Sequence, residues 1–287
     1  MRIFTLVNSA GETYDITSKS SLFYDPSGLG MSVSHSFRQV GDRWVKVDSK
    51  PQQGSIGGKI AFVSDDPYLS YYNFVDFIKK EPLILLYCPN PDATGKPSGL
   101  VYRRNVLVSK LSKTELEMEH WLNCSITFVA LTPWYKYQAI SNGKEEELDI
   151  LKWGITWGLN WGPLSEYEKG ITSDGNVNSP AKLTIYGPVT NPRWTHYVNG
   201  IEFETGKITA NIDENEYLIV DNTVDPYVIQ KRSAVNDSFI ADLYESSDKT
   251  TKRFISLQNG TNTVSVTGDG VTNPYTKLEA YIYYDTV

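Results

Sequence analysis

At 287 residues, with 40% hydrophobic and 21% charged residues, the chain is long enough for two ordinary domains or for one large β domain. Its formal net charge is −7 and no run of Lys and Arg is longer than a pair such as Arg103-Arg104, so it lacks the basic surface that binding to nucleic-acid phosphates requires. No segment approaches the roughly 20 apolar residues of a membrane span, and the N-terminus turns polar too early for a signal peptide, so we expect no membrane insertion and folding in the cytoplasm.

The first elements along the chain are predicted strands. A short strand, a turn at 8–11 and a second short strand are expected over residues 2–16, and a further pair is expected at 33–40 and 44–47. Gly41-Asp42 marks the turn of that pair, and residues 50–57 are predicted to form a loop. The aromatic load of 19 Tyr, 10 Phe and 7 Trp also favours β structure.

One helix is predicted, in the segment SDDPYLSYYNFVDFIKK. A polar residue at 64–66 can cap its N-terminus, and Pro67 suits the first helical position, where the missing N–H costs nothing. The spacing i, i+3, i+4, i+7 predicts one buried face made of Tyr71, Phe74, Val75 and Ile78. The lysines at 79–80 complement the helix dipole, and Pro82 then stops the helix.

Strands are predicted again after the helix, at 83–90, 101–111 and 121–131. The two cysteines of the chain, Cys88 and Cys124, lie in these apolar stretches. Two buried free thiols in a reducing compartment are the expected state, and a single disulfide is the alternative.

The second half of the sequence changes character. Residues 145–149 form an acidic run, which is typical of an exposed connection between domains. Beyond residue 166, short alternating segments separated by turn signals predict an antiparallel β-sandwich with no second convincing helix. The sequence therefore predicts a mainly β protein, in which a β domain with one packed helix is followed by β structure alone.

No segment has the residue spacing of a catalytic, cofactor or metal site. His35, His120 and His196 are scattered, without the spacing of zinc ligands or of a catalytic triad. Phosphate-binding and nucleophile-elbow motifs are missing, and the segment SDGNVNS matches only the first positions of a calcium loop. No local motif marks a carboxylate pair for glycoside hydrolysis. We therefore expect no enzymatic activity, no cofactor and no metal ion.

Three tryptophans in the stretch KWGITWGLNWG, namely Trp153, Trp157 and Trp161, are spaced four residues apart. With Trp194 they are the candidate carbohydrate-binding or interface aromatics of the chain. Three glycines disfavour a helix here, since each costs about 1 kcal/mol relative to Ala. An extended strand would place the three indoles on one face. We interpret the stretch as an extended segment that packs one domain against the next or against a neighbouring subunit.

Several stretches of the sequence, taken in order, carry a family resemblance. In the first half they are YLSYYNFVDFIKKEPLILLYCPN, YRRNVLVSKLSKTE and LNCSITFVALTPWYK. In the second half they are ITSDGNVNSPAKLTIYGPVTNPRW, ENEYLIVDN and FISLQNGTNTVSV, with a Leu-x-x-Gly-x-Asn turn at 257–262. At the turn that begins ENEYLIVDN, this chain has Asn215-Glu216 where members of the family named next often have Gly-Glu. These stretches resemble the distal tail proteins (Dit family) of long-tailed, siphophage-type bacteriophages.

The resemblance implies a fold in three parts. Residues 1–137 would be an N-terminal ring-forming (belt) domain, β-sandwich-like with one packed α-helix. Residues 138–165 would be an aromatic connecting segment, and residues 166–287 a C-terminal galectin-like antiparallel β-sandwich.

The resemblance also implies a place in the virion. The chain would form a homohexameric ring at the tail tip (baseplate hub), assembled in the bacterial host cytoplasm, and would join the tail tube protein to the tail-associated tip protein around the DNA channel. The tape measure and receptor-binding proteins are further candidate partners. A host cell-wall carbohydrate-binding module that acts through the C-terminal sandwich is the alternative function.

Overall fold

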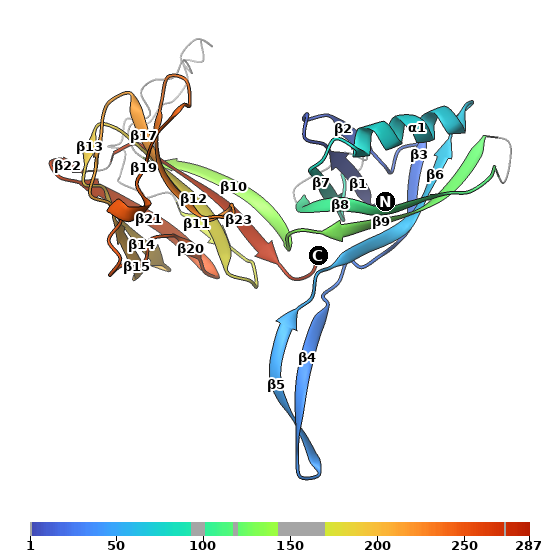
Figure 1. The fold of residues 1–287 in the computed structure, drawn as a ribbon, viewed down its shortest axis with the longest axis horizontal. Helices are drawn as coiled ribbons and strands as arrows, with labels where there is room; N and C mark the ends of the chain where they lie inside the picture. Colours follow the sequence, from blue (N-terminus) through green and yellow to red (C-terminus); the bar gives the residue numbers. More distant parts are fainter. Residues whose placement is uncertain (1, 93–100, 117–119, 143–169, 273) are drawn as a thin grey trace. The chain divides into compact units, whose positions relative to one another are not determined.

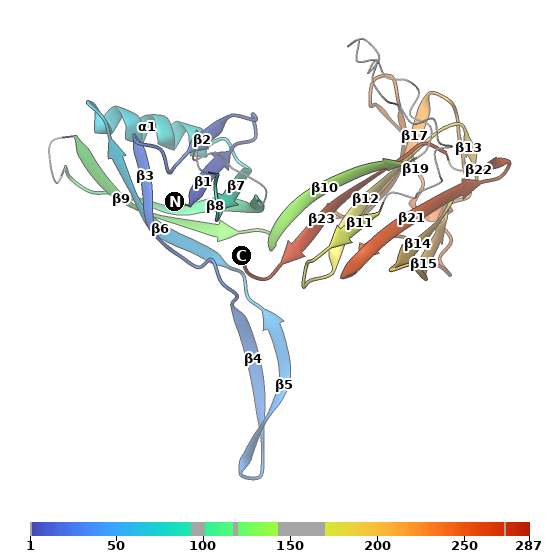
Figure 2. The same ribbon diagram turned by 180° about the vertical axis from the view of Figure 1, so that it is seen from behind.

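The computed structural model describes residues 2–92, 101–116, 120–142, 170–272 and 274–287 (Figures 1 and 2). The chain divides into two compact units: unit 1 is Met1–Lys136 with Tyr284–Val287, and unit 2 is Tyr137–Tyr283. Both units consist mainly of antiparallel strands, which confirms the predicted fold class. The predicted connecting segment 138–165 lies mostly outside the described residues, so the domain boundaries at 137 and 166 stay a proposal.

Unit 1 contains the single α-helix of the described residues and the first strands of the chain. The elements are β1 (Ile3–Val7), β2 (Thr13–Asp15), β3 (Ser21–Ser27), β4 (Val33–Val40), β5 (Arg43–Pro51), β6 (Ser55–Val63), α1 (Pro67–Ile78), β7 (Leu83–Cys88), β8 (Tyr102–Lys113), β9 (Trp121–Ala130) and the start of β10 (Trp134–Asn142).

A single antiparallel sheet organises unit 1. Its strands follow the order β2-β1-β7-β8-β9-β6-β3. The two ends of this order also meet, because Ile16 N–H donates to Phe4 O and Phe23 N–H donates to Ile16 O. The sheet therefore curls around a core in which the Phe4 ring stacks on Tyr87 at 4.8 Å between centroids and meets Phe23 edge-on at 5.2 Å.

Helix α1 packs against β6 and β9, and its N-terminus is built as the sequence predicts. Asp66 caps the helix by accepting a hydrogen bond from Leu69 N–H at 2.9 Å, and Pro67 occupies the first turn. The buried face differs from the predicted one, because Phe77 is buried whereas Tyr71 and Val75 are only half-buried. The buried residues of the helix are Pro67, Phe74, Phe77 and Ile78.

Two other expectations for unit 1 can be compared with the structure. Cys88 and Cys124 are buried free thiols, which confirms the expected state. The predicted loop at 50–57 is wrong at both ends, because β5 continues through Pro51 and β6 begins at Ser55. The strands extend into this polar stretch because each continues its pairing, β5 with β4 and β6 with β9.

Unit 2 contains the end of β10 and short strands up to the end of the chain. They are β11 (Ile171–Ser173), β12 (Ser179–Tyr186), β13 (Val189–Thr190), β14 (Arg193–Val198), β15 (Ile201–Lys207), β16 (Asn211–Ile212), β17 (Glu216–Asp221), β18 (Val228–Ser233), β19 (Phe239–Asp242), the 3-10 turn η2 (Tyr244–Ser246), β20 (Ser256–Leu257), β21 (Gly260–Gly268), β22 (Val271–Thr272) and β23 (Thr276–Tyr284).

Two sheets form the sandwich of unit 2. One has the order β19-β18-β17-β12-β23-β10, and the other has the order β11-β21-β14-β15. Strand β23 alternates between buried and half-buried side chains along its whole length, as expected for a strand with one face on a core. The sandwich predicted from the alternating segments beyond residue 166 is thus present.

Glu279 on β23 ties β10 into the first sheet. It accepts a hydrogen bond from the hydroxyl of Tyr137 and forms ion pairs with Lys277 at 3.1 Å and Lys182 at 3.6 Å. Burial by itself would raise the pKa of Glu279, but the Tyr137 hydroxyl and the two lysines outweigh it and lower the pKa below its usual value. The ionised carboxylate is therefore the form that the fold favours.

The lowered pKa of Glu279 predicts an acid-dependent loss of stability. A carboxylate whose pKa falls on folding stabilises the protein above its unfolded pKa, about 4.3 for Glu, and loses that contribution as the pH drops through the folded value. We expect Glu279→Gln to destabilise the protein by about 1 kcal/mol at pH 7. The difference from the wild type should vanish at pH 3 in urea unfolding curves. A constant difference from pH 7 to pH 3 would contradict this assignment.

Candidate functional site

The hairpin formed by β4 and β5 is the most exposed element of unit 1, and Figure 1 shows it extending away from the sheet of that unit. Its pairing runs from Val33 opposite Pro51 to Val40 opposite Arg43. Gly41 turns the chain with φ of 61°, a conformation that a two-residue hairpin loop requires and that glycine adopts without strain. We call residues 33–51 the hairpin arm.

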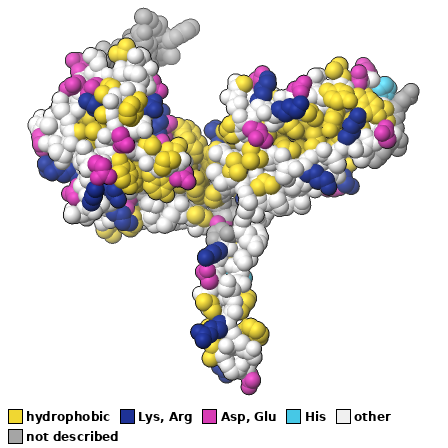
Figure 3. Space-filling view, in the orientation of Figure 1, with side chains coloured by type: hydrophobic (Ala, Val, Ile, Leu, Met, Phe, Trp, Pro, Cys, Tyr) yellow, Lys and Arg dark blue, Asp and Glu magenta, His cyan; other side chains and the backbone are white. Residues whose placement is uncertain are grey.

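Both faces of the hairpin arm carry exposed apolar side chains, and Figure 3 shows hydrophobic side chains on the side of the arm that faces the viewer. The register places Phe37 and Trp44 on one face and Val40 and Val45 on the other. The exposed large hydrophobic residues of the arm are Phe37, Val40, Trp44, Val45 and Val47, with Trp44 reaching 68%. Contiguous exposed apolar groups of this kind mark interaction surfaces.

The hairpin arm is also more basic than the rest of the chain. It carries Arg38, Arg43, Lys46 and Lys50 against Asp42 and Asp48, in a chain whose net charge is −7. A two-stranded hairpin without a buried face is only marginally stable in water. The arm therefore combines apolar side chains, positive charge and open backbone edges, the features of a segment that a partner surface completes.

The structure describes only one of the four predicted site residues. Trp153, Trp157 and Trp161 lie outside the described residues. Trp194 lies on β14 inside the sandwich, only 1% exposed, and a Cβ atom at Gly206 would come within 2.1 Å of its ring. In unit 2 the Trp194 indole therefore packs in the core, and a role in binding sugar or another subunit stays a prediction.

A buried polar cluster on the second sheet of unit 2 was not anticipated from the sequence. His196 Nδ1 lies 3.2 Å from Glu204 Oε1, and His196 Nε2 lies 3.0 Å from Asn262 Oδ1. Asn262 Oδ1 also accepts from Gln258 N–H at 3.0 Å, which fixes this amide oxygen as an acceptor. The Nε2 of His196 is therefore the donor in its hydrogen bond with Asn262.

The Glu204 carboxylate of this cluster also has partners outside it. Ser256 N–H donates to Glu204 Oε1 at 2.9 Å, and Lys252 Nζ lies 3.7 Å from Glu204 Oε2. The side chains of His196 and Glu204 are 0% and 2% exposed, and neither residue lines a pocket among those described. The cluster joins β14, β15 and β21 through His196, Glu204 and Asn262, which is a structural role.

The described residues give no catalytic or metal-binding constellation. No group of three or more His, Cys, Asp or Glu side chains among them could hold a metal ion. No helix in the described part of the chain is long and apolar enough to cross a membrane. The hairpin arm is thus the strongest candidate for a functional surface.

Comparisons with known proteins agree on the kind of fold. A family model described as the distal tail protein, N-terminal domain, matches residues 3–131. A chain of the phage P2 baseplate in its activated conformation with Ca is 16% identical with a TM-score of 0.63, and the match covers 100% of both chains. The SPP1 Dit protein, described as a hub adsorption apparatus, is 10% identical with a TM-score of 0.58, and the match covers 96% of this chain and 98% of that one. No curated protein matches the sequence.

Proposed function

This chain belongs to the distal tail protein family, a family of structural proteins of the phage tail, and we propose that it acts without catalysis as the ring-forming hub of a siphophage tail tip. In this proposal six copies form the ring. The ring joins the tail tube to the tail-associated tip protein and surrounds the DNA channel. The hub would assemble in the host cytoplasm and remain at the virion tail tip.

The observation that carries this proposal is the hairpin arm within the family-matched region. Its exposed apolar residues and open strand edges have no partner surface among the described residues of unit 1. A ring component needs such edges and arms for its neighbours, whereas an enzyme needs a cleft with reactive groups. The likeness to the SPP1 Dit hub and to a phage P2 baseplate chain supports the same conclusion at the level of the fold.

Mass measurement tests the ring directly. Native mass spectrometry of the purified protein should show a species of six times 32.3 kDa that dissociates on dilution. If the chain is monomeric alone, the hexamer should form on addition of the tail tube and tip proteins of the same phage. A strict monomer at high concentration in the presence of both partners would contradict the proposal.

The carbohydrate-binding alternative has no supporting observation in the described residues. Trp194, the one candidate aromatic that the structure describes, has no ring face open to a pyranose. A purified chain that bound host cell-wall saccharide saturably would restore this alternative.

A further inference from the structure

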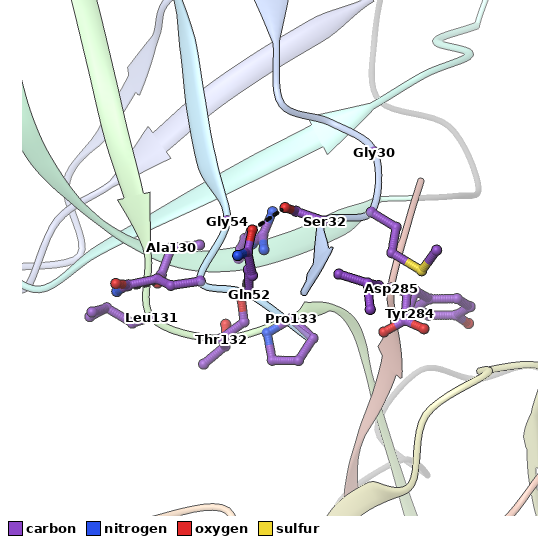
Figure 4. Close-up of a pocket in the computed structure, with 14 residues that line it drawn as sticks. Gly30, Ser32, Gln52, Gly54, Ala130, Leu131, Thr132, Pro133, Tyr284 and Asp285 are labelled. Carbon is purple, nitrogen blue, oxygen red and sulfur yellow. Dashed lines mark hydrogen bonds between the residues drawn. The ribbon is translucent and has the colours of Figure 1, made fainter. Parts of the chain in front are cut away.

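A pocket of about 390 Å³ lies at the root of the hairpin arm, within unit 1 (Figure 4). Its walls come from the residues on either side of the arm, from the connection between β9 and β10, and from the end of the chain. Ser32 Oγ donates to Gln52 Oε1 at 2.9 Å across the root, as the dashed line in Figure 4 shows. The pocket lining is mostly neutral, with two charged residues, the buried Arg104 and Asp285.

Arg104 holds its positive charge without a counter-charge. It is 7% exposed, and its Nε donates to Thr132 O at 2.9 Å. Its Nη1 is buried without a hydrogen-bond partner, and none of the described acidic residues forms an ion pair with it. Burial lowers the pKa of the Arg104 guanidinium from its usual value. A buried charge is costly unless it is paired, so this arrangement calls for an acceptor.

A second orphan donor lies beside the first. The Arg104 guanidinium sits over the Trp134 ring at 5.3 Å, and the Nε1 of Trp134 is also buried without a partner. Both unpaired atoms are donors, but of the two residues only Arg104 lines the pocket, so the group that the pocket lacks is an acceptor for its guanidinium. The guanidinium packs against Gly54 and needs a glycine there, because a Cβ atom at residue 54 would come within 2.5 Å of Arg104 Nη2.

The chemistry of the site selects a carboxylate. The planar fork of a guanidinium binds carboxylate or phosphate oxygens through two parallel hydrogen bonds. Asp285 also lines the pocket, and its charge disfavours a phosphate dianion more than a singly charged carboxylate. Ser32 and Gln52 add neutral hydrogen-bonding groups near the opening.

We propose that this pocket is a carboxylate-binding site and that an Asp or Glu side chain of a second copy of the chain occupies it in the assembled ring. A second copy suits the site because the chain has 34 acidic residues against 27 basic ones. The pocket also adjoins the hairpin arm, the part of unit 1 that is open for assembly. The assignment of the occupant to a second copy rests on the proposed ring function, whereas the preference of the pocket for a carboxylate rests on Arg104 alone.

The test of the ligand uses N-acetyl-glutamate α-amide, which carries only the side-chain carboxylate, and N-acetyl-glutamine amide as its uncharged isostere. Saturation-transfer difference NMR is recorded on the full chain at a concentration where native mass spectrometry shows monomer. We expect saturable binding of the first probe at least tenfold tighter than of the second. Equal binding of the two probes would overturn the carboxylate site. So would displacement of the charged probe by inorganic phosphate at a phosphate concentration below that of the probe.

Variants on one strand separate the site from general charge effects. Arg104→Gln should abolish the preference for the charged probe, and Arg104→Lys should weaken it while keeping the charge. Arg103→Gln removes an exposed charge from the residue next to Arg104 on β8. This variant is the matched control and should bind the charged probe like the wild type. Melting curves of each variant confirm that the chain is folded. Retained binding in a folded Arg104→Gln variant would also overturn the proposal.

The occupant is tested by assembly of the same variants. Arg104→Gln should require at least a tenfold higher protein concentration for half-assembly, and excess charged probe should dissociate the wild-type ring. Unchanged assembly of Arg104→Gln would overturn occupancy by a second copy. A wild-type chain that never forms a ring would defeat the proposed function instead, while the probe titration would still decide the carboxylate site.

Discussion

Removing the apolar side chains of the hairpin arm is expected to leave a folded protein that no longer assembles. The variant is Phe37→Ser with Trp44→Ser and Val47→Ser, three positions that are 57%, 68% and 64% exposed. Side chains this exposed contribute little to the stability of the isolated chain, so the melting temperature should stay within a few degrees of the wild type. In an interface, large aromatic residues of this kind each contribute about 2 kcal/mol or more.

The measurement is the concentration of half-assembly, from native mass spectrometry or light scattering. The triple variant should raise it by more than about 100-fold, because two hot-spot residues at about 2 kcal/mol each correspond to roughly a thousandfold in the equilibrium constant. Val235→Ser is the matched control, since Val235 is 79% exposed but lies in unit 2. If the triple variant assembled like this control, the hairpin arm would not be the assembly surface.

Glu204→Ala is expected to be the most destabilising single substitution of a polar residue in unit 2. It removes the acceptor of His196 Nδ1 and of Ser256 N–H in a cluster that solvent does not reach. Breaking a buried pair by removing one partner costs about 3–5 kcal/mol, because the other partner stays buried without compensation. For a unit of this size the loss corresponds to a fall of roughly 10 °C in melting temperature.

Calorimetry of the full chain measures this effect. Glu202→Ala, an exposed glutamate on the same strand, should change the melting temperature by less than about 2 °C. The double variant Glu204→Ala with His196→Ala should lower the melting temperature by less than the sum of the two single variants, because the two side chains act as one unit. If the two falls in melting temperature were strictly additive, or if Glu204→Ala lowered the melting temperature no more than Glu202→Ala, the cluster would not stabilise the sandwich.

Local features of the fold could be predicted because they depend on neighbours in the sequence. The cap at Asp66, the proline in the first turn and the apolar spacing of α1 are local rules. The turn at Gly41 follows in the same way, since only a few residue types accept its φ of 61°. The buried face of α1 was partly wrong, because β6 and β9 decide how the helix is rotated.

The candidate surfaces could not be predicted, because burial is a property of the whole fold. Polar and apolar residues alternate in the hairpin arm as they do in any half-buried strand. The local sequence pattern therefore does not indicate that both faces of the arm remain exposed to solvent. Arg103 and Arg104 are adjacent, and strand alternation requires only that they point to opposite faces. Which of the two becomes buried depends on the strands around β8.

The sequence by itself determined the mainly β composition, helix α1, the buried thiols and, through ordered turn and strand motifs, the resemblance to a tail-protein family. Tertiary structure alone decided that the hairpin arm stands free, that Trp194 is enclosed, and that His196, Glu204 and Asn262 meet although 66 residues separate the first from the last. The reason is physical: hydrogen bonds and hydrophobic spacing within an element act over a few residues. Burial and the pairing of polar groups depend on which distant strands the sheet brings together.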